Sequence, residues 1–401
     1  MPDLEKQAFA EPSASNAQPI TSEPNPDAET HPKRSVWKIT LAVLKLVAVN
    51  FIIFAVLVEL VCLIYIHVTN WHSSKPTYHV NYNSFWADIN PAFGVWHRPN
   101  GHFYHQGGCF SAQYTTNSYG ARDVERSLHS SRPRTVVLGD SMIEGVGLND
   151  EDRLTNILEK RTGEEYLNFG TGGDFGPLQY ALLYKTLASR FDHDTVLVAI
   201  LPDNDFRDMS LEWGKVHHQG RYRPSYADDL SVVYTGHVQP ESGEGLWDHV
   251  EAVLRAYLAS YHVGQYLYSS MYLRTLPPYS GYNDFTNVDL VHLNKALQDI
   301  KATAEEHHAR MAMVVIPTYI DFLRFRQSGA NRLGPILATW GRDNGIPVKD
   351  LLPEMYARSG GNFPPLFLSC DGHWTARGSK VAADVLQPWL AQLNMEAKAH
   401  R

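Results

Sequence analysis

The stretch from Arg134 to Gly147 reads RTVVLGDSMIEGVG, an apolar run that ends at Gly139 and is followed by Asp-Ser. A short apolar run of this kind indicates a buried strand. Similar runs recur downstream, at Tyr166–Phe169, Thr195–Leu201, Met311–Ile316 and Ile346–Val348. Helical stretches are expected around Leu154–Gly163, Pro177–Phe191, Val288–His308 and Arg377–Leu393. Strands that alternate with helices predict an α/β fold, with a parallel sheet covered by helices on both faces.

Polar clusters follow three of these strands. The first strand ends in Gly139-Asp140-Ser141, the second leads into Asn168–Gly173, and the third into Pro202–Asp205. A fourth cluster, Cys370–Trp374 (CDGHW), precedes the last helix. Ligands of open parallel sheets bind beyond the carboxyl ends of the strands. A serine, a histidine with a carboxylate two residues before it, and amide donors on separate loops together predict an acyl-transfer site.

The chemistry assigns a role to each catalytic candidate. Ser141 is the predicted nucleophile, and a serine hydroxyl needs a base within hydrogen-bond reach. His373 can be that base, and Asp371 can hold its other nitrogen. Each of these residues alone would suit an ordinary turn or helix cap; their occurrence together favours catalysis. Other carboxylates lie close in sequence, and we expect Asp140 to stabilise its own loop.

The developing oxyanion needs donors that are in place before the reaction. The candidates are the backbone N–H groups of Ser141 and Gly173 and the side-chain amide of Asn204. A glycine at 173 lets the backbone approach the substrate without a Cβ in the way. Neighbouring glycines compete for the same role, at Gly170, Gly172 and Gly176.

These blocks, in this order, resemble the SGNH (GDSL) hydrolases. The resemblance rests on VVLGDSMIEGVG (Val136–Gly147), NFGTGGD (Asn168–Asp174), Pro202–Asp205 and DGHWTARGSKVAAD (Asp371–Asp384), and less firmly on NSYGARD (Asn117–Asp123). It implies a flavodoxin-like three-layer SGNH hydrolase fold with a parallel sheet. It also implies ester hydrolysis without a metal or organic cofactor.

The sequence departs from the family pattern in two places. Pro202 stands where the third block usually has glycine, and Asp371-x-His373 is one residue shorter than the commonest spacing. The shorter spacing looks like that of the membrane-associated branch related to alginate O-acetyltransferases, which acts on exported polysaccharide. The resemblance therefore implies an esterase acting on an ester, such as an O-acylated glycan. The alternatives are an O-acyltransferase for cell-envelope or exported polysaccharide, supplied by a membrane acyl-donor partner, and an inactive glycan-binding or assembly subunit.

Composition excludes several other classes. The 401 residues carry a formal net charge of −8, whereas a nucleic-acid-binding protein would show a basic face. The histidine pairs His217-His218 and His307-His308 have no third ligand at a suitable spacing, so no metal site is predicted.

Tyrosines and tryptophans are frequent between residues 213 and 282, where they can line a sugar or acyl groove or pack an inserted segment.

A long apolar stretch runs from Ile39 to Val68, more than the roughly 20 residues that one bilayer crossing requires. Lys33, Arg34 and Lys38 precede it, which predicts a cytoplasmic N-terminus and an extracytoplasmic (in a bacterium, periplasmic) catalytic domain. A cleaved signal peptide would be shorter, so we expect an uncleaved single-pass anchor in the lipid bilayer. Glu59 lies inside the span, either as a partner-pairing or proton-handling carboxylate or as a protonated or water-reaching one.

The predicted organisation has four parts. Residues 1–37 form an acidic disordered cytoplasmic tail, residues 38–69 a transmembrane helix, and residues 70–130 an extracytoplasmic lead-in. Residues 131–395 form the hydrolase-like domain, with an insertion at about 206–285.

Cys109 and Cys370 are the cysteines outside the predicted span, and both would lie in an oxidising compartment. They either form a disulfide that fixes the loop with Asp371 and His373, or remain two buried free thiols.

Overall fold

The computed structural model describes residues 33–68, 73–80, 85–86, 88–173, 175–217, 221–236, 245–276 and 278–399. Most of the predicted acidic tail, residues 1–32, lies outside this set. The chain divides into two compact units, Met1–Leu57 and Val58–Arg401. The first unit contains the beginning of helix α1 (Lys33–Val68), and the second contains its end and all later elements.

Helix α1 contains the predicted span. Within the described residues it is the one helix long and apolar enough to cross a membrane, over Val36–Val68. Its side chains are almost all exposed as far as Leu57. From Val58 onward the exposure becomes periodic, and Ile66 is completely buried. The last turns of α1, from Val58 onward, therefore pack within the second unit.

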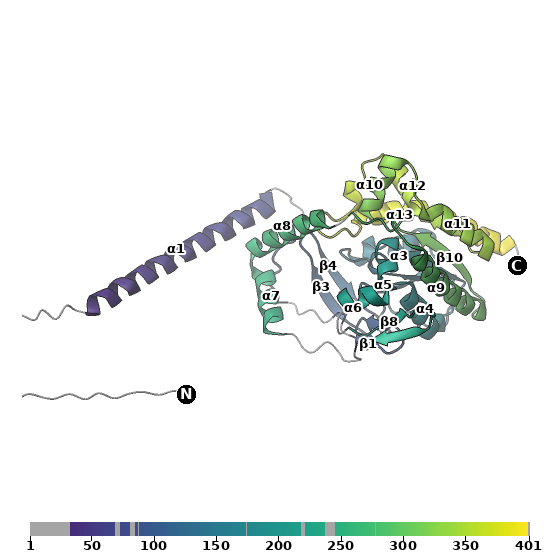
Figure 1. The fold of residues 1–401 in the computed structure, drawn as a ribbon, viewed down its shortest axis with the longest axis horizontal. Helices are drawn as coiled ribbons and strands as arrows, with labels where there is room; N and C mark the ends of the chain where they lie inside the picture. Colours follow the sequence, from purple (N-terminus) through teal and green to yellow (C-terminus); the bar gives the residue numbers. More distant parts are fainter. Residues whose placement is uncertain are drawn as a thin grey trace, which may run out of the picture. The chain divides into compact units, whose positions relative to one another are not determined.

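The second unit is built on one five-stranded parallel sheet (Figure 1). Its strands are β5 (Arg134–Gly139), β6 (Glu165–Gly170), β7 (Thr195–Ile200), β10 (Arg310–Val315) and β11 (Val348–Asp350). They lie in the order β11-β10-β7-β5-β6, all pairs parallel. Counted along the chain, this is the 2-1-3-4-5 order of flavodoxin-like sheets, which confirms the predicted fold class.

The central strands carry the apolar runs that identified them. Every residue of β5, β6 and β7 is buried. Strand β11 begins two residues later than predicted, at Val348. The reason is the end of the preceding helix: Gly345 adopts a left-handed conformation, and the N–H of Ile346 bonds to the carbonyl of Gly341 at 2.8 Å.

Helices cover the sheet in two layers. One layer pairs α4 (Pro177–Thr186) with α9 (Asn287–Glu306), and the other packs α3 (Leu154–Thr162) and α12 (Leu351–Arg358) against α13 (Ala376–Ala399). Helix α4 begins at a proline, and α9 begins with a capping box between Thr286 and Asp289. The sequence had not indicated α10 (Tyr319–Ser328), α11 (Leu333–Asn344) or α12. Short helical turns are α2 (Ser141–Glu144), Asp150–Asp152, Ala188–Arg190 and Pro364–Leu366.

The lead-in that the sequence could not place consists of two hairpins. One pairs β1 (Asp88–Asn90) with β2 (Gly94–Trp96), and the other pairs β3 (His102–Gln106) with β4 (Ser111–Thr115), both antiparallel. A small aromatic core supports the second hairpin, made by Phe85, Trp86, Phe103 and Tyr114.

The segment predicted as an insertion contains helices and one hairpin. Its elements are α5 (Pro202–Asp208), α6 (Leu211–His217), β8 (Arg223–Tyr226), β9 (Val232–Thr235), α7 (Leu246–Tyr257) and α8 (Ala259–Thr275). Its aromatic residues divide between two environments: Tyr226 is buried, whereas Tyr268 and Tyr272 are exposed.

Candidate active site

The candidate site lies where three neighbouring strands of the sheet end. Ser141 directly follows the Gly139-Asp140 end of β5, Gly172 follows β6, and Asn204 lies in α5, directly after β7. Since these three strands are adjacent, their carboxyl ends bring the residues to one edge of the sheet. There they line a cavity of about 270 Å³, together with Trp86, His105, Asp140, Val146, Thr171, Phe175 and His373. Among the described residues, no three His, Cys, Asp or Glu side chains gather as metal ligands would.

Ser141, His373 and Asp371 form a hydrogen-bonded chain. The Oγ of Ser141 lies 2.7 Å from Nε2 of His373, in position to donate its proton. The other ring nitrogen, Nδ1, donates to Oδ1 of Asp371. This bond leaves Nε2 free to accept a proton, which is the tautomer that a general base requires. The structure thus brings together the three residues that the sequence proposed, although their catalytic roles stay predictions.

The electrostatics of the pair favour an imidazolium once it forms. Burial opposes the charge of His373, but attraction to Asp371 and the hydrogen bond between them outweigh it, so the pKa of His373 lies above 6.5. Burial likewise raises the pKa of Asp371, but His373 outweighs burial and the net shift is downward. Asp371 therefore stays ionised beside the histidine and can stabilise a positive charge on the imidazole.

Asp140 stabilises the turn that carries Ser141, as we expected. Its Oδ1 accepts the N–H of Met142 at 3.0 Å and caps the short helix α2. Burial raises the pKa of Asp140 to about 6. The turn packs tightly on the end of β6, because a Cβ at Gly170 would lie 2.3 Å from the backbone nitrogen of Glu144. Only glycine fits at that position.

Arg122 supports the same turn from the lead-in side. It is completely buried, and its guanidinium donates to the carbonyls of Glu144 at 3.0 Å, Gly145 at 2.7 Å and Leu148 at 2.6 Å. Its guanidinium also stacks on the ring of Tyr114. The weakly matching NSYGARD block therefore contributes the side chain that holds the chain directly after Ser141.

The sequence did not identify Glu144 as a residue of the candidate site. It is completely buried, and its carboxylate accepts the N–H of Gly172, while Nε1 of Trp86 donates to it at 3.2 Å. Nε2 of His97 lies 3.5 Å away. Burial acts to raise the pKa of Glu144, but His97 and Arg122 outweigh it and the pKa lies below its usual value. An acidic residue three positions after the serine was the available signal, but its partners are remote in sequence.

The structure brings only some of the candidate oxyanion donors to the cavity. Asn204 lines the cavity, at the first turn of α5, which begins at Pro202. Gly173 does not line it; a Cβ there would lie 2.7 Å from Val95, so this glycine lies against β2. Gly172 faces the cavity instead, but its N–H is bonded to Glu144. The glycine-rich loop thus brings a different glycine to the cavity than the one we expected.

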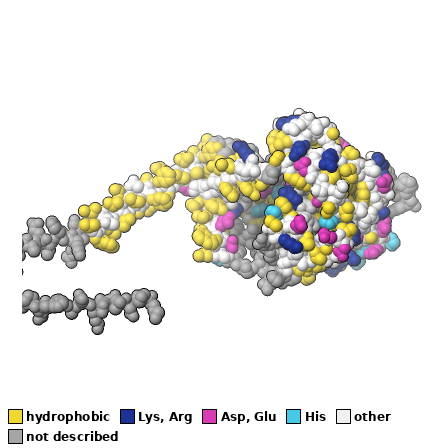
Figure 2. Space-filling model, viewed as in Figure 1, with side chains coloured by type: hydrophobic (Ala, Val, Ile, Leu, Met, Phe, Trp, Pro, Cys, Tyr) yellow, Lys and Arg dark blue, Asp and Glu magenta, His cyan; other side chains and the backbone are white. Residues whose placement is uncertain are grey.

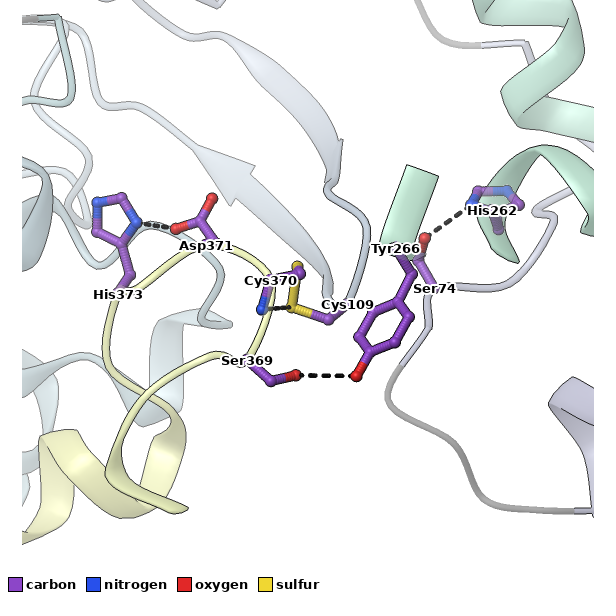
Figure 3. The surroundings of a disulfide bond; sticks show 8 residues. All are labelled: Ser74, Cys109, His262, Tyr266, Ser369, Cys370, Asp371 and His373. Carbon is purple, nitrogen blue, oxygen red and sulfur yellow. Dashed lines mark hydrogen bonds and ion pairs between the residues drawn. A yellow bond between two sulfur atoms is a disulfide. The ribbon is translucent and has the colours of Figure 1, made fainter. Parts of the chain in front are cut away.

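The loop that carries His373 is cross-linked to the lead-in. Cys109 and Cys370 form a disulfide, and the N–H of Cys370 also points to the sulfur of Cys109 (Figure 3). Within the loop, the N–H of Leu368 bonds to the carbonyl of His373 at 2.7 Å. The cross-link lies one residue before Asp371 and therefore restrains the positions of both Asp371 and His373.

Two residues of the lead-in also reach the cavity, Trp86 and His105. Burial lowers the pKa of His105 to about 4, so it is neutral near pH 7. Neither residue belongs to a recognisable motif: His105 lies in β3, and Trp86 packs against the β3–β4 hairpin.

Neither a family model nor a curated protein matches this chain. Among solved structures, a lipolytic protein of the G-D-S-L family from Desulfitobacterium hafniense is similar at 10% identity and a TM-score of 0.35, over 64% of this chain and 98% of that one. An acylhydrolase from Bacteroides fragilis is 14% identical with a TM-score of 0.34, over 66% of this chain and 89% of that one. A two-domain esterase active on acetylated mannans is 13% identical with a TM-score of 0.34, over 66% of this chain and 50% of that one. TM-scores this low do not support a fold or an activity. The fold assignment therefore depends on the order of the sheet strands, and the proposed chemistry depends on the geometry of the site.

Proposed function

We propose that this protein is a membrane-anchored serine esterase that cleaves a short acyl group from an ester, with an O-acylated glycan as its substrate class. The observation that carries the proposal is the hydrogen-bonded chain from Ser141 through His373 to Asp371 at the carboxyl end of a parallel sheet. Nucleophilic catalysis by a serine needs a base next to the hydroxyl and a carboxylate that orients the base. This arrangement provides both.

The reaction proceeds in two halves. Oγ of Ser141 attacks the acyl carbonyl while Nε2 of His373 takes its proton, and the imidazolium then gives that proton to the departing alcohol. Water attacks the acyl-serine with the same histidine as base, which releases the carboxylic acid and restores Ser141. The N–H of Ser141 and the side-chain amide of Asn204 are the proposed donors to the oxyanion in both halves.

The size of the cavity favours a small acyl group. About 270 Å³ lies at or below the lower end of ordinary ligand pockets, roughly 300–1,000 Å³. Trp86 and Phe175 provide apolar ring surfaces at its wall. Such surfaces suit both a short acyl chain and the apolar face of a sugar ring.

The proposed location is the outer side of a membrane, with α1 as an uncleaved anchor. The basic residues before the span favour a cytoplasmic N-terminus. A disulfide between Cys109 and Cys370 persists in an oxidising compartment. The buried Ile66 near the end of α1 argues that the helix stays with the folded domain.

The principal test is labelling of the full-length chain in detergent with a fluorophosphonate probe. Wild type and the matched control Ser328→Ala, an exposed serine of α10, should both be labelled, and Ser141→Ala should not. A folded wild type that stays unlabelled would instead favour the inactive glycan-binding subunit.

Acyl transfer remains a second candidate because of the short Asp371-x-His373 spacing. Incubation with an acetyl ester and an oligosaccharide separates the two reactions. Free acetate alone supports hydrolysis, whereas an acetylated oligosaccharide that disappears in Ser141→Ala supports transfer.

A further inference from the structure

Helices α7 and α8 carry an exposed apolar surface. On α7 its members are Leu246, Trp247, Val250, Val253 and Tyr257, and on or just after α8 they are Leu267, Tyr268, Met271, Tyr272 and Leu276. We call these residues the α7–α8 surface. Trp247 is 80% exposed and Met271 is 66% exposed. Hydrophobic side chains gather over this part of the molecule in Figure 2, whereas elsewhere in residues 73–399 the large exposed ones are scattered.

The pattern on α7 is that of an amphipathic helix. Leu246, Val250, Val253 and Tyr257 recur at intervals of three or four residues and share one face. A neighbouring side of the helix, about 110° around its axis, is fixed to the domain: Ala252 and Ala256 are buried, and the carbonyl of Ala256 accepts the N–H of Tyr78 at 2.9 Å. The apolar face is therefore distinct from the side by which the helix is attached to the domain, and its side chains stay exposed.

Helix α8 has the composition of a segment at a membrane interface. It contains four tyrosines in 17 residues and, apart from His262, a single ionisable basic residue, Arg274. Tyrosine and tryptophan concentrate where hydrocarbon meets lipid headgroups, because one end of the ring is apolar and the other is polar.

The span helix is bonded directly to the start of α8. The carboxylate of Glu59 accepts the N–H of Ala259 at 2.5 Å and that of Ser260 at 3.0 Å. These are unsatisfied donors at a helix N-terminus, where a negative charge is also favourable. The intramembrane carboxylate therefore has a partner within the chain.

This contact fixes the depth of α8 relative to the span. Glu59 lies about 13 Å before the end of α1, at roughly 1.5 Å per residue. If the hydrocarbon core covers about 20 residues ending near His67, Glu59 lies below its outer boundary; if it begins after Lys38, Glu59 lies at that boundary. In both placements the start of α8 lies in or at the edge of the bilayer.

We propose that α7 and α8 form a second membrane-contacting element, with the α7–α8 surface inserted among the lipids of the leaflet from which α1 emerges. The inference rests on the proposed membrane anchoring of α1. We infer that the lipid bilayer covers the α7–α8 surface, because the hydrogen bonds of Glu59 join the start of α8 to α1, the helix proposed to cross that bilayer.

The inner side of α8 connects this element to the catalytic loop. The hydroxyl of Tyr266 lies 3.5 Å from Oγ of Ser369, next to the disulfide at Cys370, and Ser74 bonds to His262 at 2.7 Å (Figure 3). Helix α8 therefore contacts the loop that carries Asp371 and His373, so a bilayer at the α7–α8 surface would lie close to that loop.

The test uses full-length protein in phospholipid vesicles that contain a nitroxide-labelled lipid. Single cysteines replace Trp247 and Met271 in a Cys62→Ser background, with the native disulfide left oxidised, and each carries a fluorescent label. Val288→Cys on α9, 60% exposed, is the matched control, and Phe54→Cys, 65% exposed, reports the span. Size-exclusion chromatography and thermal unfolding of the same samples show that each variant is folded, and fluorophosphonate labelling of Ser141 is recorded separately.

We expect the labels at 247 and 271 to be quenched by the nitroxide lipid several-fold more than the label at 288, and to be protected from aqueous iodide. Quenching no greater than at 288, with the label at 54 quenched, overturns the inference. Protection from both quenchers also overturns it, in favour of a second copy or a protein partner on this surface. An unquenched label at 54 overturns the membrane anchoring and this inference together, while labelling of Ser141 still reports the catalytic proposal separately.

Discussion

The two sides of the candidate site are built in different ways. The turn of Ser141 is enclosed: Met142, Ile143 and Glu144 are buried, and Arg122 bonds to the backbone that follows. The loop of His373 lies at the surface, with 23% of the histidine side chain and 29% of the Asp371 side chain exposed. It is restrained by the disulfide at Cys370 and a few backbone bonds.

This difference follows from where each side chain comes from. The proposed nucleophile, Ser141, follows a central strand, so core packing fixes it directly. The proposed base, His373, arrives on a loop 232 residues later, and only a restraint at the loop itself can hold it within hydrogen-bond distance of the serine. Damage to the nucleophile side should therefore appear first as lost stability, and damage to the base side first as lost activity.

The largest effect is expected from Asp371→Asn. Loss of the carboxylate removes both the orientation of His373 and the compensation of its charge, which lowers kcat/KM by roughly 10⁴-fold with little change in thermal unfolding. Esterase assays compare it with Asp384→Asn, which removes a carboxylate paired with Arg161 away from the site. A loss below about tenfold would assign the orienting role to another carboxylate.

Arg122→Met should destabilise the fold on the nucleophile side. Three carbonyls lose a charged donor in a buried position, and we expect the free energy of unfolding to fall by roughly 3–5 kcal/mol. Denaturant unfolding in detergent measures the change, with the exposed Arg190→Met as the control. Equal stability of the two variants would mean that the turn is held by packing alone.

Replacing both Cys109 and Cys370 with serine tests the restraint on the base side. The cross-link closes a long loop, so its loss should lower stability by about 2–4 kcal/mol and also reduce kcat, because the position of His373 becomes less defined. Cys62→Ser, which removes the free cysteine, is the control. Full activity in the double variant would show that the loop is fixed without the disulfide.

The pH dependence of kcat/KM tests the role of His373 as the base and is the smallest of the expected effects. His373 must be neutral to accept a proton, and its pKa lies above 6.5, so kcat/KM should fall as the pH drops through a midpoint above 6.5, about tenfold per unit below it. Glu144 is one of the carboxylates that raise this pKa, so Glu144→Gln should move the midpoint toward lower pH. The pH–rate profiles of the two proteins measure both effects. A wild-type kcat/KM that stays unchanged as the pH drops below the ordinary pKa range of histidine contradicts the assignment.

The sequence by itself indicated the five sheet strands, helices α3, α4, α9 and α13, and the candidates Ser141, Asp371 and His373, because these depend on local signals. Apolar runs, helix caps and short motifs report the conformation of neighbouring residues. Tertiary structure alone decided the partners that are distant along the chain: Arg122 with the Ser141 turn, Glu144 with Gly172, and Glu59 with the start of α8. It also decided that Gly172 rather than Gly173 lines the cavity. Such pairings join residues tens to hundreds of positions apart, and their cause is the packing of whole elements, which local periodicity does not record.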